Sequence, residues 1–200
     1  MKRTIIKMAV LALLLAAGAV SVVFAQASGN KYVGAEKCKN CHSSAAKGDQ
    51  YGNWKKEKHA VAVETLSTDK AKEAGKAKGV ADPATDPKCL KCHVTAYSEP
   101  AGMKDPKFDP KQGVQCESCH GPGGNHVKAR LMAAANEEEG DVFGGGGDDK
   151  PKQIPAGEIN AKPDAKVCTT CHNSESPSYK EFKYDEFVKK IAHPDPRKSK

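Results

Sequence analysis

The longest apolar stretch of the chain lies at its N-terminus. Residues 8–24 are almost entirely hydrophobic, three basic residues precede them, and the small residues Ala25 and Ala27 come directly after. A basic start, an apolar run and a small-residue site are typical of a secretory signal peptide. We predict a signal peptide over residues 1–25, with cleavage after Ala25 or Ala27. The run is at the short end for spanning a bilayer, so we expect no stable membrane anchor after cleavage.

Three amphipathic patterns follow in the rest of the chain. The pattern over 51–66 predicts a helix in which His59 lies on the apolar face. A second helix is predicted over 126–139, after a turn of glycines and a proline. A third is predicted over 184–192, and Pro194 ends it.

The segments between these patterns are polar and rich in Pro, Gly and Lys. Residues 67–88 predict a short exposed helix followed by a loop, and residues 95–115 contain three prolines and predict irregular chain. Residues 140–166 include four consecutive glycines and predict a flexible linker or insertion. Strand signals are few, so we expect a mainly α fold with extensive irregular chain.

All eight cysteines fall in four copies of the sequence Cys-x-x-Cys-His. This is the attachment motif for c-type haem, in which two thiols form thioethers and the histidine becomes the proximal iron ligand. We therefore predict four covalently attached haem c groups. The predicted attachment residues are Cys38, Cys41, Cys89, Cys92, Cys116, Cys119, Cys168 and Cys171, and the proximal ligands are His42, His93, His120 and His172.

Two other uses of the cysteines fit the sequence less well. Four disulfides would explain the even count, but not the histidine after every second cysteine. A zinc ribbon needs its two Cys-x-x-Cys pairs about 15–20 residues apart, and the shortest gap here, from Cys92 to Cys116, is wider. Export agrees with c-type haem, because attachment takes place outside the cytoplasm. We expect a periplasmic protein, with the extracellular space as the alternative.

The composition of the mature chain also favours a cofactor-filled interior. Roughly 175 residues remain after cleavage, which is the size of one domain, and they are poor in large apolar side chains. Four porphyrins would supply much of the missing core, so we predict a single tetrahaem cytochrome domain over residues 28–200, wrapped around its haems. The apoprotein should be largely unfolded.

The charge balance adds little about partners. The formal net charge of +7 falls by three, to +4, when the signal's Lys2, Arg3 and Lys7 are removed, and haem propionates lower it further. We therefore do not predict nucleic-acid binding. The lysines at 70, 72, 76 and 78 are more typical of a solvated face than of a docking patch.

Seven histidines are available for eight axial positions. Besides the four proximal residues, His59, His126 and His193 are the candidate distal ligands. One iron is then left without a histidine, and three options are open: a five-coordinate open site, a methionine (Met103 or Met132), or a histidine from a second subunit. A bis-histidine haem suits electron transfer, whereas an open iron can bind a small ligand.

The chain resembles the cytochrome c-554 family of tetrahaem electron carriers. The resemblance is carried mainly by Gly-Val-Gln-Cys-Glu-Ser-Cys-His-Gly-Pro-Gly over 113–123, with His126 shortly after, and less by residues 54–60 and 182–194. It implies that His126 completes the haem of His42, that His193 completes that of His120, and that His59 completes that of His172. It also implies that the haem of His93 has no distal protein ligand.

Three functions are compatible with these features. An electron carrier between two redox partner proteins is the first hypothesis, and it predicts no substrate chemistry. The second is a reductase of a small molecule such as nitric oxide at an open haem. The third is a subunit of a conductive filament, which would be a homo-oligomer. The sequence identifies neither the partners nor any catalytic residue.

Overall fold

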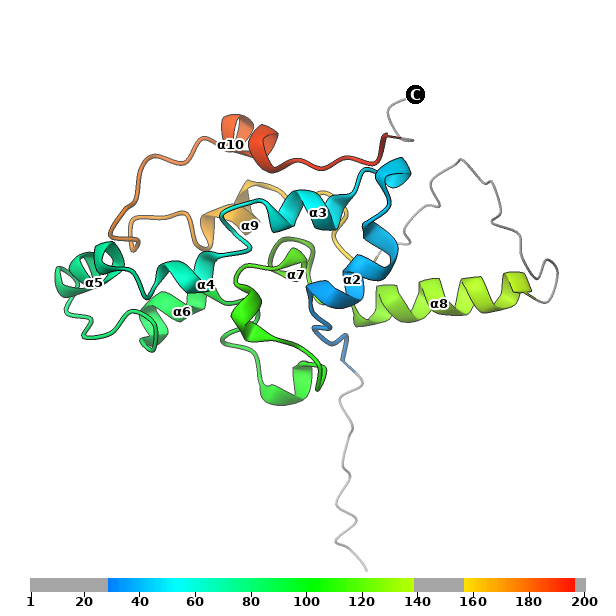
Figure 1. Cartoon of the computed structure of the whole chain (residues 1–200), viewed down its shortest axis with the longest axis horizontal. Helices are drawn as coiled ribbons and strands as arrows, with labels where there is room; N and C mark the ends of the chain where they lie inside the picture. The colour runs from blue at the N-terminus through cyan, green and yellow to red at the C-terminus, as the bar shows by residue number, and fades with distance from the viewer. Residues whose placement is uncertain (1–28, 139–156, 197–200) are drawn as a thin grey trace, which may run out of the picture.

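The computed structural model describes residues 29–138 and 157–196. The predicted signal peptide and most of the predicted insertion lie outside these residues. The described part contains short helices and three single 3-10 turns, joined by irregular chain (Figure 1). In order they are α2 (Ala35–His42), η1 (Ala45–Lys47), α3 (Gln50–Lys55), α4 (Ala62–Thr65), α5 (Asp69–Lys76), α6 (Pro87–His93), η2 (Ala101–Met103), η3 (Pro110–Gln112), α7 (Cys116–His120), α8 (Gly124–Glu138), α9 (Ala165–Thr169) and α10 (Tyr184–Ile191).

The fold class is as predicted, mainly helical with much irregular chain. The described residues form no strand, and their only β-type pairing is an isolated bridge between Tyr32 and Lys104. The helices over 124–138 and 184–191 confirm two of the three predicted patterns, and α5 confirms the short exposed helix. In the described ranges no helix is long and apolar enough to cross a membrane.

The prediction of one continuous helix over 51–66 was wrong. The chain leaves the helix after Lys55 and resumes it only at α4. In the gap, the carbonyl of His59 accepts a hydrogen bond from the backbone N–H of Val114 at 3.0 Å. A Cβ on Gly113 would lie 2.7 Å from that same carbonyl, so only glycine permits this close approach. The break thus depends on a partner far along the chain.

Each Cys-x-x-Cys-His motif lies on or at the end of a short helix. Two of these helices have their own N-caps: the Asp86 carboxylate accepts from the N–H of Lys88 before α6, and Asp164 accepts from those of Lys166 and Val167 before α9. Two cysteines three residues apart in a helical turn lie on the same face. The local sequence therefore presents both thiols of a motif to one side.

The first and third motifs are joined by two buried side chains, that of Glu117 on α7 and that of Gln115 directly before it. The Glu117 carboxylate accepts hydrogen bonds from the N–H groups of Val33, Gly34 and Gly123, at 2.7–3.0 Å, and the Gln115 amide oxygen accepts from Ala35 at 2.7 Å. These N–H groups lie at the starts of α2 and α8, where a helix leaves its donors unpaired. Burial raises the pKa of Glu117, and its three N–H donors oppose that shift.

The apolar core of the described chain is small. Ala35, Trp54 and Ala60 form its central cluster, with Tyr51 and Cys116 packed against it. The Trp54 indole N–H donates to the carbonyl of Val114 at 2.8 Å, which links α3 to the segment directly before α7. All buried residues of the described chain lie in residues 30–124. We call this range the N-terminal block.

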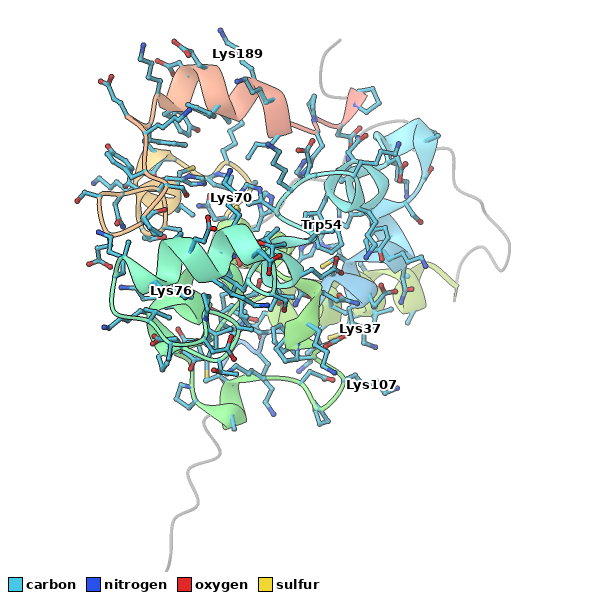
Figure 2. The ribbon with its side chains drawn as sticks, turned by 60° about the vertical axis from the view of Figure 1, so that its left-hand side comes forward. Lys37, Trp54, Lys70, Lys76, Lys107 and Lys189 are labelled. Atoms are coloured by element: carbon cyan, nitrogen blue, oxygen red, sulfur yellow. The ribbon has the colours of Figure 1, made fainter. Side chains whose placement is uncertain are left out.

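The C-terminal segment, residues 157–196, has no buried residue. It runs along one side of the N-terminal block, with α9 and α10 in the upper part of Figure 1. Helix α8 extends away from the rest of the described chain, and its Leu131 and Met132 are exposed. Lysines are spread over many elements rather than one, as the labelled side chains of Figure 2 show for Lys37, Lys70, Lys76, Lys107 and Lys189.

Candidate haem-binding sites

Six of the seven histidines face one another in three pairs. The ring centroids of His42 and His126 are 6.3 Å apart, those of His59 and His172 are 6.0 Å apart, and those of His120 and His193 are 6.1 Å apart. Each pair joins one motif histidine to one of the three remaining histidines. The pairs are the same three that the resemblance implied.

The spacing of these pairs fits two imidazoles on opposite sides of one iron. A metal–imidazole bond is about 2.0–2.1 Å long, and adding the distance from ring nitrogen to ring centre on both sides gives roughly 6 Å between centroids. The rings of each pair are tilted or edge-on to each other, and none of the described hydrogen bonds of these histidines joins the two members of a pair. The residues present therefore leave room for an iron between the members of each pair.

The Nδ1 atoms of four histidines are occupied by hydrogen bonds. His93 contacts the Ala62 carbonyl at 2.7 Å, His120 the Asn160 carbonyl at 2.6 Å and His193 the Ile191 carbonyl at 2.9 Å, whereas His126 contacts the Glu158 carboxylate at 3.1 Å. A metal-bound histidine almost always donates its second ring N–H in this way, which fixes the orientation of the ring. In these four histidines Nε2 is the nitrogen left for a metal.

Burial keeps several of the rings in the form that a metal requires. It is the main cause that lowers the pKa of His42, His59, His120 and His172. A lowered pKa favours neutral imidazole, and only the neutral ring has a lone pair free for iron.

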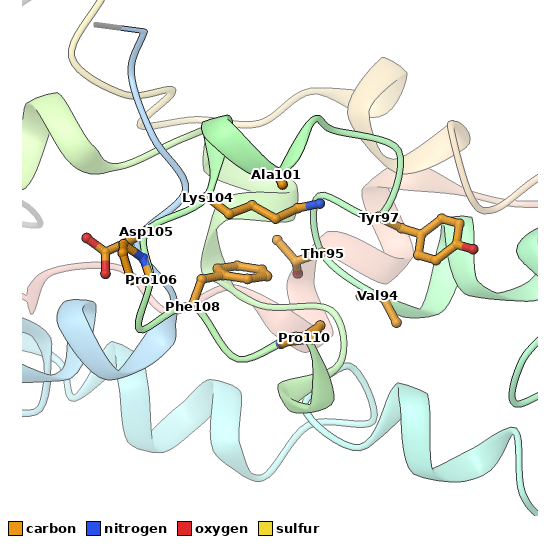
Figure 3. A pocket seen from close by; sticks show the side chains of 9 residues that line it. All are labelled: Val94, Thr95, Tyr97, Ala101, Lys104, Asp105, Pro106, Phe108 and Pro110. Carbon is orange, nitrogen blue, oxygen red and sulfur yellow. The ribbon is translucent and has the colours of Figure 1, made fainter. Parts of the chain in front are cut away.

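His93 differs from the other motif histidines. Among residues 29–138 and 157–196, which include all seven histidines, no second histidine ring faces it. The chain that follows it lines a cavity of about 510 Å³ (Figure 3). In Figure 3 the side chains of Thr95, Lys104 and Phe108 point into the same space. Of the two candidate methionines, Met132 is 57% exposed on α8.

Contacts between segments show which motifs are neighbours. The backbone N–H of Gly34, at the start of the helix that carries the first motif, donates to Glu117 of the third. The His120 ring of the third motif contacts the carbonyl of Asn160, in the segment that leads into the fourth. Cys171 of the fourth motif and Cys92 of the second line one pocket. The first motif therefore adjoins the third, the third adjoins the fourth, and the fourth adjoins the second.

Another feature fits a haem at the first motif. Two buried side-chain atoms in the described chain have no hydrogen-bond partner, Oε1 of Gln50 and Nε of Arg130. Arg130 bonds to Glu158, which contacts His126, so this free guanidinium N–H lies near the first histidine pair. It is suited to an anion such as a haem propionate. None of the eight cysteines is in a disulfide, so all eight are left for haem attachment.

These features define a multihaem c-type cytochrome. Residues 37–121 match the family model described as "Cytochrome c554 and c-prime". The chain is 31% identical over 183 residues to cytochrome c-554 from Nitrosomonas europaea, which spans 80% of this chain and 73% of that protein. The solved structure of reduced cytochrome c554 from the same organism matches it with a TM-score of 0.56 at 27% identity, covering 84% of this chain and 86% of that one.

The chain belongs to the cytochrome c-554 family. It is a tetrahaem c-type cytochrome of the electron-transfer type, and its haem is covalently bound.

The groups that contact Nδ1 of the histidines could not be identified from the sequence. Glu158 and Asn160 lie at the end of the segment expected to be a linker, yet they contact His126 and His120. The carbonyls of Ala62, Asn160 and Ile191 carry no sequence signal at all, because every residue has one. Glu158 could have been noticed only as an acidic residue close before the fourth motif.

Proposed function

We propose that this chain is a periplasmic electron carrier in which three haems have two histidine ligands and one has a single histidine. The three facing histidine pairs carry this proposal, because they are spaced for one iron each. His126 would pair with His42, His193 with His120 and His59 with His172. His93, of the second motif, would be the only histidine on the remaining iron.

The chain's own residues would serve this function by holding the attachment sites in a row. When bound, each haem supplies an iron that gains or loses one electron. The contacts between their segments order the motifs as first, third, fourth and second, so the first and second motifs would lie at the two ends. Redox partner proteins would then dock near these ends, one as donor and one as acceptor.

A second candidate function rests on the cavity lined by the chain that follows His93. With a free position on iron and a space of about 510 Å³ nearby, the protein would bind a small diatomic ligand such as nitric oxide. Polar and apolar side chains both line this cavity, among them Thr95, Tyr97, Lys104 and Asp105 next to Phe108 and Pro110. The carrier function needs no such space, so ligand binding separates the two candidates.

An EPR spectrum of the purified ferric holoprotein tests the proposal. We expect three low-spin haems and one high-spin haem. The variants H59A, H126A and H193A should each turn one further haem high-spin, whereas the controls M103L and M132L should leave the spectrum unchanged. Four low-spin haems in the parent protein would contradict the open site, and loss of one low-spin signal in M103L would assign that ligand to methionine instead.

Fractionation of the source cells tests the location and assembly. A periplasmic carrier should be released by osmotic shock and elute as a monomer or small oligomer in size exclusion. Elution as a polydisperse assembly, with filaments in the microscope, would favour the filament hypothesis.

A further inference from the structure

One of the paired histidines is backed by a charged group rather than a carbonyl. His126 contacts Glu158 through Nδ1 at 3.1 Å, and the terminal nitrogen Nη2 of Arg130 contacts both carboxylate oxygens of Glu158 at 2.7 Å. Both His126 and Arg130 lie on α8, four residues apart, so they share one face of that helix. Glu158 reaches them from the start of the C-terminal segment.

The three groups are largely shielded from water. The side chains of His126, Glu158 and Arg130 are 15%, 14% and 27% exposed. Nη2 of Arg130 lies 2.7 Å from both oxygens of Glu158, the geometry of a cation paired with a carboxylate. Because the three side chains are mostly buried, the charge of that carboxylate acts on His126 with little screening by solvent.

A carboxylate partner changes what a histidine offers to iron. By accepting the Nδ1 proton's hydrogen bond, the anion makes Nε2 a stronger electron donor and fixes the ring in one orientation. A stronger donor and a nearby negative charge both favour ferric over ferrous iron. Backbone carbonyls, which serve His93, His120 and His193 here, are neutral and do this more weakly.

We propose that Glu158, steadied by Arg130, is a positioning residue that makes His126 a stronger ligand and lowers the reduction potential of the haem attached through Cys38 and Cys41. The proposal rests on the proposed role of His126 as the distal ligand of that haem. Arg130 sets the size of the effect, because its positive charge offsets part of the carboxylate's. Glu158 and Arg130 also join α8 to the C-terminal segment, so a purely structural role is the alternative.

Spectropotentiometric titration of the holoprotein distinguishes the two roles. In E158Q, one of the four potentials should move to a more positive value while the other three stay unchanged. In R130Q, the same potential should move to a more negative value, because the carboxylate is left without its cation. A structural role predicts instead that both variants shift this potential in the same direction or lose the ligand.

Two more variants separate the hydrogen bond from the charge. E158D keeps the charge but withdraws the carboxylate by one methylene, so the EPR g-values of the affected low-spin haem should change as in E158Q while its potential moves less. E175Q is the matched control, since Glu175 pairs with the exposed Lys91 and makes no ion pair with a histidine among the described residues. It should leave the E158Q-sensitive potential unchanged.

The outcomes also tell this proposal from the axial assignment beneath it. If H126A turns one haem high-spin but E158Q moves no potential and no g-value, the role of Glu158 is overturned and the assignment of His126 stands. If H126A changes no haem at all, the assignment fails and this proposal fails with it. Equal shifts of one potential in E158Q and E175Q would also overturn it, because they would reflect charge alone.

Discussion

The N-terminal block and the C-terminal segment hold their haem motifs in different ways. The block joins its first and third motifs through buried groups, among them Glu117, Gln115 and the Trp54 indole. The C-terminal segment buries no residue, and its described ties to the block include the histidine pairs of His172 and His193 and two hydrogen bonds between Asn160 and His120. The proposed ligation of haem would thus take the place of an apolar core in the C-terminal segment, whereas it would supplement a core in the block.

Preventing attachment of the haem at the fourth motif should have the largest effect on the C-terminal segment. In C168A/C171A the attachment thiols are gone, so the C-terminal segment would lose its main link to the block. We expect limited proteolysis to cleave within 157–196 at least tenfold faster than in the parent, on the order of a 1.4 kcal/mol change in local opening. The N-terminal block should remain protected. Mass spectrometry of the fragments locates the cuts, and equal cleavage of both parts would contradict the comparison.

Glu117→Ala should act inside the block instead. It leaves three buried N–H groups, of Val33, Gly34 and Gly123, without an acceptor. Each unsatisfied buried donor costs about 1–3 kcal/mol, so unfolding of the holoprotein should become easier by at least about 3 kcal/mol. Denaturant titration followed by far-UV circular dichroism measures this.

The matched control for that variant lies in the C-terminal segment. Glu186 is also a glutamate, but it pairs with Lys183 at the surface and is 64% exposed. Glu186→Ala should change the midpoint of unfolding by no measurable amount. A similar loss in both variants would mean that overall charge, and not the buried hydrogen bonds, stabilises the block.

The same contrast explains which features the sequence predicted. Covalent haem attachment is written in five adjacent residues, so the motifs could be identified without any structure. The count of seven histidines left one of the eight axial positions without a histidine, and the specific pairings came from the resemblance. The single helix over 51–66 failed because its break depends on Gly113 meeting His59, a contact between distant positions that helical periodicity does not encode. The partners of Nδ1 escaped for the same reason.

Trp54→Phe should have a moderate effect on the block. The substitution keeps an aromatic ring in the cluster with Ala35 and Ala60 but removes the indole N–H, so the carbonyl of Val114 loses its donor. We expect a loss of about 1–2 kcal/mol in the free energy of unfolding, with no change in the visible spectrum of the haems. A shift in the Soret band would show that Trp54 acts on a haem rather than on the chain, and would weaken the division drawn above.

Phe187→Ala should have the smallest effect, because it tests packing where the chain has little of it. Phe187 stacks on Phe182 at 5.3 Å, and Phe182 stacks on the His172 ring at 4.8 Å, yet Phe187 is 38% exposed. An aromatic pair of this kind contributes about 0.5–1.5 kcal/mol beyond area burial, so the loss in the free energy of unfolding should be about 1 kcal/mol. The haem attached next to His172 should stay low-spin by EPR. If the loss instead matched that of a core aromatic, about 3–5 kcal/mol, then packing and not ligation would hold the C-terminal segment in place.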